Sequence, residues 1–121
     1  MSALYQEIII DHYRHPRCHG VLSNATASAN GLNASCGDKL HMDILIEGDT
    51  IKTVRFEGVG CAISQASASL LLESIEGKAI DEVRALTPND VLQLLGVPLS
   101  PSRMKCGLLS LETLKKTLSQ L

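Results

Sequence analysis

Apolar and polar side chains alternate over residues 39–44, which leaves the backbone few options there. Leu40, Met42 and Ile44 stand at every second position, with polar residues between them. Successive side chains of a β-strand point to opposite faces, so this period of two predicts a strand with one buried face. Residues 47–49 (Glu-Gly-Asp) are a turn signal, and apolar positions resume over residues 50–57. The two segments together predict a β-hairpin.

Helical periodicity flanks the hairpin on both sides. Residues 2–15 carry apolar side chains at helical spacings, and Pro16 disfavours helical geometry at the residue before it. Downstream, Gly77 is placed to end one helix, and Thr87 and Gly96 are placed to cap another. We therefore predict a single α+β domain over residues 1–121, a small antiparallel β-sheet with helices packed on one face. The predicted helices cover residues 2–15, 63–76, 80–86, 88–95 and 101–121.

The segment before the hairpin has a different composition. Residues 17–35 are rich in Ser, Asn, Ala, Thr and Gly and contain almost no large apolar side chains. Loops of this length are usually functional or disordered. We predict a long mobile loop here.

Charge and aromatic content exclude two classes of function. The formal net charge is −2, whereas a sequence-independent nucleic-acid binder needs a basic face to displace counterions. A base-stacking platform needs more aromatics than Tyr5, Tyr13 and Phe56. The first ten residues lack the basic region of a signal peptide, and no apolar run reaches the ~20 residues that span a bilayer. We expect a cytoplasmic protein with no nucleic-acid or membrane partner.

The cysteines carry the main chemical signal. They are widely spaced and form no Cys-x-x-Cys pair. In a reducing compartment, such thiols serve metal or thiol chemistry more often than they form disulfides. The four residues are Cys18, Cys36, Cys61 and Cys106.

Three of these cysteines, taken singly, have a structural interpretation beside a chemical one. Cys36 stands two residues before Asp38, either in an ordinary turn or beside a useful hard oxygen. Cys61 precedes a predicted helix, whose N-terminus favours a thiolate, but it also suits a buried small hydrophobe. Cys106 lies next to Lys105 and off the leucine stripe of the last helix, either in a site or as a partly exposed thiol.

The remaining polar candidates are interpreted as incidental. Cys18 lies in a polar loop setting beside a histidine. His12, His15 and His41 are predicted to be helix-surface, loop or strand-surface contacts rather than ligands.

The three cysteines and Asp38 taken together indicate a metal site more specifically than any one of them alone. Cys36, Cys61 and Cys106 each lie at a segment junction beside small or flexible residues, so they could converge with Asp38 at one end of the domain. Three thiolates and one carboxylate suit tetrahedral Zn²⁺, or an iron–sulfur cluster with one weak oxygen ligand. A cluster that lacks its fourth cysteine should be labile, which suits transfer to another protein.

The chain resembles the U-type iron–sulfur cluster assembly scaffold family, IscU and SufU, together with the N-terminal domain of NifU. The resemblance covers nearly the whole chain, with several motifs in the same order and at compatible separations. The matching segments are Leu4-Tyr5, Ile10-Asp11-His12-Tyr13, His15-Pro16-Arg17, Cys36-Gly37-Asp38, Phe56-Glu57-Gly58, Gly60-Cys61-Ala62-Ile63-Ser64, Ala66-Ser67-Ala68-Ser69, Gly77-Lys78 and Arg103-Met104-Lys105-Cys106.

The resemblance implies an IscU/SufU-like fold and a set of functional residues. Cys36, Cys61 and Cys106 would be the functional thiols, with Asp38 as their partner in binding a metal or a transient [2Fe–2S] cluster. Sulfur would arrive as persulfide from an IscS- or SufS-like cysteine desulfurase, and recipient apo-proteins would take the cluster. Zinc often occupies the same site when no cluster is present. By family position, Cys106 is the first sulfur acceptor in an IscU-like mechanism and Cys36 in a SufU-like one.

Departures from the family pattern bear on partners. The short segment between residues 78 and 105 resembles IscU, whereas Lys105 stands where IscU-like proteins usually carry a histidine. Residues 98–103 (Pro-Leu-Ser-Pro-Ser-Arg) do not reproduce the Leu-Pro-Pro-Val-Lys segment by which IscU engages an Hsp70-type chaperone, so that partner does not carry over. Cys18 has no counterpart in the family motifs.

Three functions remain open on the sequence alone. The first is a non-enzymatic scaffold that accepts sulfur and assembles a transient cluster. The second is a zinc-dependent sulfurtransferase that relays persulfide sulfur without holding a cluster. The third is a structural zinc domain without sulfur traffic.

Overall fold

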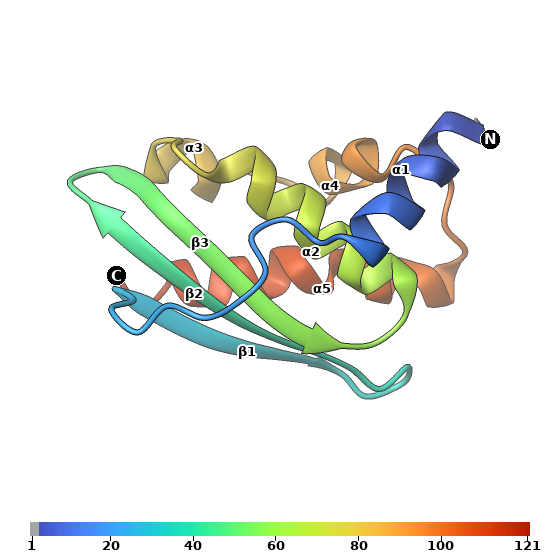
Figure 1. The fold of residues 1–121 in the computed structure, drawn as a ribbon, viewed down its shortest axis with the longest axis horizontal. Coiled ribbons are helices and arrows are strands. Elements are labelled where there is room, and N and C mark those ends of the chain that lie inside the picture. The colour runs from blue at the N-terminus through green and yellow to red at the C-terminus, as the bar shows by residue number, and fades with distance from the viewer. Residues whose placement is uncertain (1–2) are drawn as a thin grey trace.

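The computed structural model describes residues 3–121, which form five helices and three strands (Figure 1). Residue 2 of the first predicted helix lies outside the described residues. The helices after the sheet begin and end close to the predicted positions, except that the last helix stops at Leu118. The elements are α1 (Ala3–Arg14), β1 (Ala27–Asn33), β2 (Asp38–Glu47), β3 (Thr50–Val59), α2 (Ala62–Ile75), α3 (Ile80–Arg84), α4 (Pro88–Leu95) and α5 (Pro101–Leu118).

The sheet is antiparallel with strand order β1-β2-β3. Met42 on the central strand pairs with Ala29 on one side and Phe56 on the other. These residues are buried, as are Leu40 and Ile44 at the other inward positions of β2. The alternating apolar residues of β2 therefore form the buried face of the sheet, as the pattern predicts. The predicted α+β class is confirmed.

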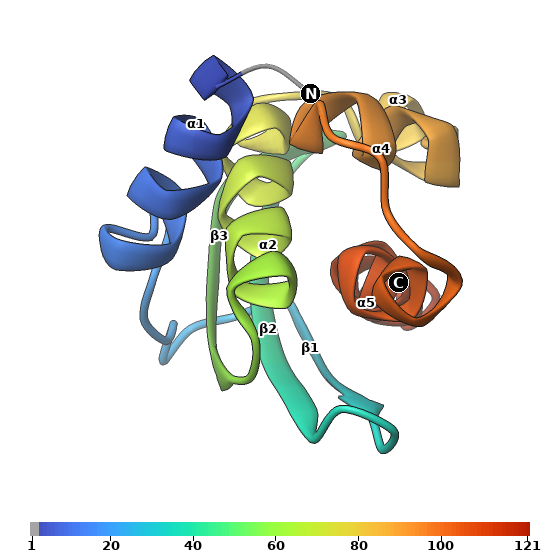
Figure 2. The same cartoon turned by 90° about the vertical axis from the view of Figure 1, so that its right-hand side faces the viewer.

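Helices cover this inner face in two layers. α2 contacts β3, and α5 contacts β1 and β2. α1 packs on α2, and α4 packs on both α2 and α5, so neither α1 nor α4 belongs to the layer next to the sheet (Figure 2). The core is aliphatic apart from Phe56, as the composition requires. No helix within residues 3–121 has both the length and the hydropathy to cross a bilayer.

The prediction of one long loop over residues 17–35 was wrong, because β1 occupies residues 27–33. Ala27 and Ala29 face inward and are buried, although they offer little apolar contrast with their neighbours. A Cβ at Gly31 would collide with the Thr113 side chain, so a small residue there lets α5 approach the strand closely. Close packing of α5 on β1 requires small inward residues. Without large apolar side chains at alternate positions, the sequence shows no period-two pattern by which the strand could be predicted.

The free edge of β1 is bonded to the last turn of α5 and to the turn that follows this helix. Lys116 Nζ donates to the Asn30 carbonyl over 2.9 Å. The Gln120 side-chain amide donates to the Ser28 carbonyl over 2.6 Å, and its oxygen accepts from the Ser28 N–H over 3.4 Å. One side chain of α5 and one from the turn that follows it thus take the place of a fourth strand along part of this edge.

α1 is docked on α2 through a buried polar contact. His12, which we expected at the helix surface, is only 6% exposed. Its Nδ1 lies 2.7 Å from Ser69 Oγ, and that hydroxyl also accepts from the Arg17 N–H over 2.8 Å. His12 is therefore part of the packing between α1 and α2, and the surface interpretation of this residue was wrong.

Candidate metal centre

Three separate parts of the chain meet at one end of the fold. Cys36 lies in the turn between β1 and β2, and Asp38 is the first residue of β2. Cys61 is the N-cap of α2, and Cys106 lies in the second turn of α5. The β1–β2 turn, the end of β3 and the start of α5 gather on the right-hand side of Figure 1. The predicted convergence is therefore visible in the topology.

Side chains of Cys36, Asp38 and Cys106 place one ligand atom each within 4.8 Å of one another. The sulfurs of Cys36 and Cys106 are 3.2 Å apart. Cys36 is exposed, whereas Asp38 and Cys106 are fully buried at 0% exposure. Cys106 is thus not the partly exposed thiol that one interpretation of the sequence allowed.

Cys61 enters the centre mainly through its backbone. Its N–H donates to Asp38 Oδ1 over 2.9 Å. The thiol of Cys61 is half-buried and interacts with the Cys106 thiol, but it does not belong to the 4.8 Å group. Among the described residues, the structure thus brings together three of the four predicted ligands directly and leaves the fourth at the border.

Hydrogen bonds control the charge of Asp38. Burial alone would raise the pKa of this carboxyl group, but bonds from the Cys61 N–H and from the side chains of Cys106, Ser64 and Asn33 outweigh burial. The pKa of Asp38 therefore lies below its ordinary value. The centre carries a buried anion whose charge is held by donors rather than by a basic side chain.

The Cys106 thiol has the opposite tendency. Burial raises its pKa, and contacts with Cys36, Asp38 and Cys61 raise it further. A thiol in this position stays protonated unless a cation replaces its proton. The cluster of acidic groups therefore has the chemistry of a cation site.

This donor set fits a tetrahedral metal. With Zn–S bonds of about 2.3 Å, two sulfur ligands on one zinc ion lie roughly 3.8 Å apart, so small side-chain movements would open the centre to this size. Thiolates with one carboxylate also suit iron–sulfur ligation with a weak fourth ligand. Cys36, Asp38 and Cys106 would hold the ion, with Cys61 adjacent.

Two residues that shape the centre were missed by sequence reasoning. Asn33 donates its side-chain amide to Asp38 Oδ2 and approaches Cys106 Sγ. A Cβ at Gly60 would collide with the side chains of Asp38 and Ser64. Asn33 lay in the segment assigned to a loop. For Gly60, the sequence shows only that a glycine precedes Cys61, and this does not reveal that the glycine lies against Asp38 and Ser64.

Cys18 lies elsewhere. Its backbone has a φ of 57°, and its Sγ is 3.8 Å from Glu76 Oε2. Burial, together with the neighbouring Glu76 carboxylate, raises the pKa of this thiol to about 11. Cys18 packs against the main apolar core and contributes no atom to the centre.

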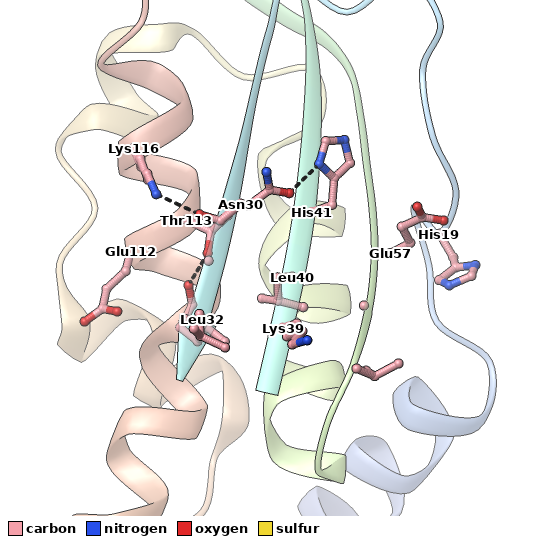
Figure 3. A pocket seen from close by; sticks show the side chains of 14 residues that line it. His19, Asn30, Leu32, Lys39, Leu40, His41, Glu57, Glu112, Thr113 and Lys116 are labelled. Carbon is pink, nitrogen blue, oxygen red and sulfur yellow. Dashed lines mark hydrogen bonds between the residues drawn. The ribbon is translucent and has the colours of Figure 1, made fainter. Parts of the chain in front are cut away.

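Two cavities border the fold without enclosing the centre. The larger, about 960 Å³, is lined by residues of β1, β2, β3 and α5 and contains none of the four cysteines. Figure 3 shows its polar wall, where His41 meets Asn30, and Lys116 reaches the backbone of the same strand. The smaller, about 680 Å³, is mostly apolar and is bordered by Cys61 and Arg103.

Comparisons with known proteins identify the family of the chain. The NifU-like N-terminal domain family matches residues 4–121. The zinc-dependent sulfurtransferase SufU of Bacillus subtilis (strain 168) is 33% identical over 133 residues, which is 96% of this chain and 90% of that protein. The iron–sulfur cluster assembly scaffold protein IscU of Thermotoga maritima is 36% identical over 134 residues, with coverages of 98% and 94%.

A solved structure extends the likeness to three dimensions. The crystal structure of FiSufU, a candidate iron–sulfur cluster assembly scaffold of the SUF system from Fervidobacterium islandicum AW-1, superposes with a TM-score of 0.80. It is 34% identical and covers 98% of this chain and 99% of its own. Sequence, fold and the thiol–carboxylate centre thus lead to one assignment: the chain belongs to the NifU-like N-terminal domain family, the U-type scaffold family of IscU and SufU.

Proposed function

We propose that this chain acts as a single-domain iron–sulfur cluster assembly scaffold. It accepts persulfide sulfur from a cysteine desulfurase, builds a labile [2Fe–2S] cluster on Cys36, Asp38, Cys61 and Cys106, and passes the cluster to apo-proteins. The names of the IscU and SufU relatives support the scaffold role and the need for a sulfur donor and recipients.

The observation that carries this proposal is the pairing of an exposed thiol with a buried one. Cys36 is open to a partner, and its sulfur lies 3.2 Å from that of buried Cys106. Sulfur that enters at Cys36 would therefore already be in contact with the interior of the centre.

Sulfur transfer at this pair needs no external redox agent. The Cys36 thiolate attacks the outer sulfur of the donor's persulfide, a new S–S bond forms at Cys36, and the donor cysteine leaves as a thiolate. The same exchange can then pass the outer sulfur to Cys106 once a bound cation has replaced the proton of this buried thiol, because the thiolate is the attacking form. Exposure supports Cys36 as the entry point, as in the SufU-like order, and burial makes Cys106 the second acceptor.

Assembly and release of the cluster as cargo would depend on Asp38. Each persulfide's outer sulfur takes two electrons from a reductant to become sulfide, and the thiolates bind the iron. Asp38 supplies an oxygen ligand that is already engaged by the Cys61 N–H. A carboxylate that shares its electrons with hydrogen bonds is a weak ligand for iron, so a recipient's thiolate can displace it.

A second function is favoured by the donor set and by the Bacillus subtilis relative, a zinc-dependent sulfurtransferase. Zinc would then occupy the same residues, and persulfide sulfur would pass through Cys36 to another carrier without cluster assembly. In this case the chain would act as an enzyme.

Reconstitution with iron, cysteine and a cysteine desulfurase separates these functions. A labile visible chromophore that is lost in the Cys36→Ser and Cys106→Ser variants supports the scaffold. Zinc-dependent stimulation of the desulfurase without a chromophore would replace the scaffold by the sulfurtransferase. Unfolding on chelation, with neither activity, would reduce the centre to a structural zinc site.

A further inference from the structure

Asn33, the last residue of β1, contacts three of the four proposed ligands. Its side-chain nitrogen lies 3.4 Å from Asp38 Oδ2 and 3.7 Å from Cys106 Sγ. Its carbonyl oxygen accepts the Cys36 N–H over 3.3 Å. The residue is 8% exposed, so these contacts are shielded from water.

The chemistry of the amide group suits both acceptors at once. A side-chain amide nitrogen carries two hydrogens and no charge, so it can donate to a carboxylate and to a sulfur simultaneously. A lysine in this place would compete with a metal cation, and an aspartate would repel Asp38. A neutral double donor orients the two anionic ligands without changing the net charge of the centre.

The backbone of Asn33 acts on the third ligand. The bond from the Cys36 N–H closes the turn between β1 and β2, and this turn presents the Cys36 thiol beside Cys106. One residue at the end of an edge strand thereby links the turn, the carboxylate and the buried thiol.

We propose that Asn33 is a positioning residue of the metal centre. Its amide aims Asp38 and Cys106 at the bound ion by donating to Asp38 Oδ2 and to Cys106 Sγ, while the Cys61 N–H donates to Asp38 Oδ1. This inference rests on the proposed function, because it requires that a metal or cluster binds to these side chains.

The test uses the whole 121-residue chain loaded with Co²⁺ or with Zn²⁺. Asn33→Leu keeps the size of the side chain and removes both donors, and Asn33→Ser serves if the leucine variant does not fold. Both keep the backbone carbonyl that closes the turn. Asn30→Leu is the matched control, since Asn30 lies on the same strand but bonds to His41 instead of the centre.

We expect Asn33→Leu to raise the dissociation constant for Zn²⁺ by about 10–100-fold, the usual effect of removing a partner that orients a ligand. The sulfur-to-Co²⁺ charge-transfer band should also move to longer wavelength, because a thiolate without an N–H donor releases electrons more easily. Asn30→Leu should leave both quantities as in the wild type.

The outcomes separate this inference from the proposed function. If wild-type protein shows a thiolate–Co²⁺ band, and both Asn33 variants keep the same band and zinc affinity, the positioning role is wrong and the metal centre stands. If the wild type shows no such band, the metal centre itself is wrong. A purely structural role would lower the denaturation midpoint of the metal-free variant without moving the band, which also rejects the inference.

Discussion

Asp38 is a buried carboxylate that stays ionised and that, as a proposed ligand, would be easily displaced. Its pKa lies below the ordinary value because donors surround it, and those same donors draw electron density from its two oxygens. A lone buried carboxylate would instead be protonated. The hydrogen bonds thus keep the ligand available while they limit its strength.

Replacing Asp38 by alanine tests this balance. We expect a reconstituted cluster to decay more slowly in Asp38→Ala than in wild-type protein, because the displaceable ligand is gone, and we expect zinc affinity to change. Loss of the visible absorption after addition of a chelator measures the first effect, and competition with a chromophoric chelator measures the second.

Asp43→Asn is the control for the Asp38 variant. Asp43 lies on the same strand and is 3% exposed, but it bonds to Ser28 and His41 instead of the centre. Equal cluster lifetimes and equal zinc affinities in Asp38→Ala and wild-type protein would rule out Asp38 as a ligand.

At the scale of residues, sequence analysis named three side chains that the structure brings together. Cys36, Asp38 and Cys106 stand in motifs whose residue types are unusual and whose order matches a known family. Asn33 could not be identified in this way, because asparagine is common in loops and its role depends on two hydrogen bonds across the fold. Candidate ligands are visible in a sequence, whereas the residues proposed to position them are found only from coordinates.

At the scale of elements, strong periodicity and good capping signals were reliable. Thr87 and Gly96 cap α4 as predicted, and the structure adds that Thr87 forms a capping box with Asp90 and that Gly96 has a left-handed φ of 69°. β1 was missed because its inward residues, Ala27, Ala29 and Gly31, are small. Capping residues determine the ends of a helix through local interactions. An edge strand that packs closely against a helix depends on tertiary contacts, which the sequence pattern does not show.

The docking of α1 on α2 should depend on pH through His12. Burial, with help from Arg17, lowers the pKa of His12 below its ordinary 6.5. At a pH between the two pKa values, His12 is therefore protonated in the unfolded chain and neutral in the folded one. Stability contributed by this neutral histidine is complete above pH 6.5 and is lost as the pH falls toward the folded pKa.

The measurement is the free energy of unfolding of metal-free protein between pH 7.5 and about 5.5, compared with the His12→Gln variant. Wild-type stability should fall with decreasing pH more steeply than that of the variant. The difference in slope is limited to about 1.4 kcal/mol per pH unit, the value for one proton. Parallel curves would show that His12 is not the group that titrates.

At the scale of the whole molecule, the centre joins the sheet to the last helix. Cys36 and Asp38 belong to the β1–β2 hairpin, and Cys106 lies 70 residues after Cys36 on α5. A metal bound to all three would close this long loop in the folded state. Metal binding and folding should therefore be coupled.

Zinc should accordingly raise the free energy of unfolding of the whole domain. At 100 times the dissociation constant, the expected gain is about 2.7 kcal/mol. Chemical denaturation with zinc and with a chelator measures it. Cys36→Ser should lose most of the gain, whereas Cys18→Ser, which changes a thiol outside the centre, should keep it. A gain that survives in Cys36→Ser would place the zinc elsewhere.

The ties between α5 and β1 have a consequence for how this domain meets other proteins. An edge strand with bare peptide groups recruits foreign strands and promotes aggregation. The Gln120 side chain offers Ser28 the same donor and acceptor as a peptide unit, and Lys116 adds a charge that a neighbouring strand would have to bury. Under the proposed function, in which partners bind and leave in turn, these bonds would protect the domain against permanent association along its sheet.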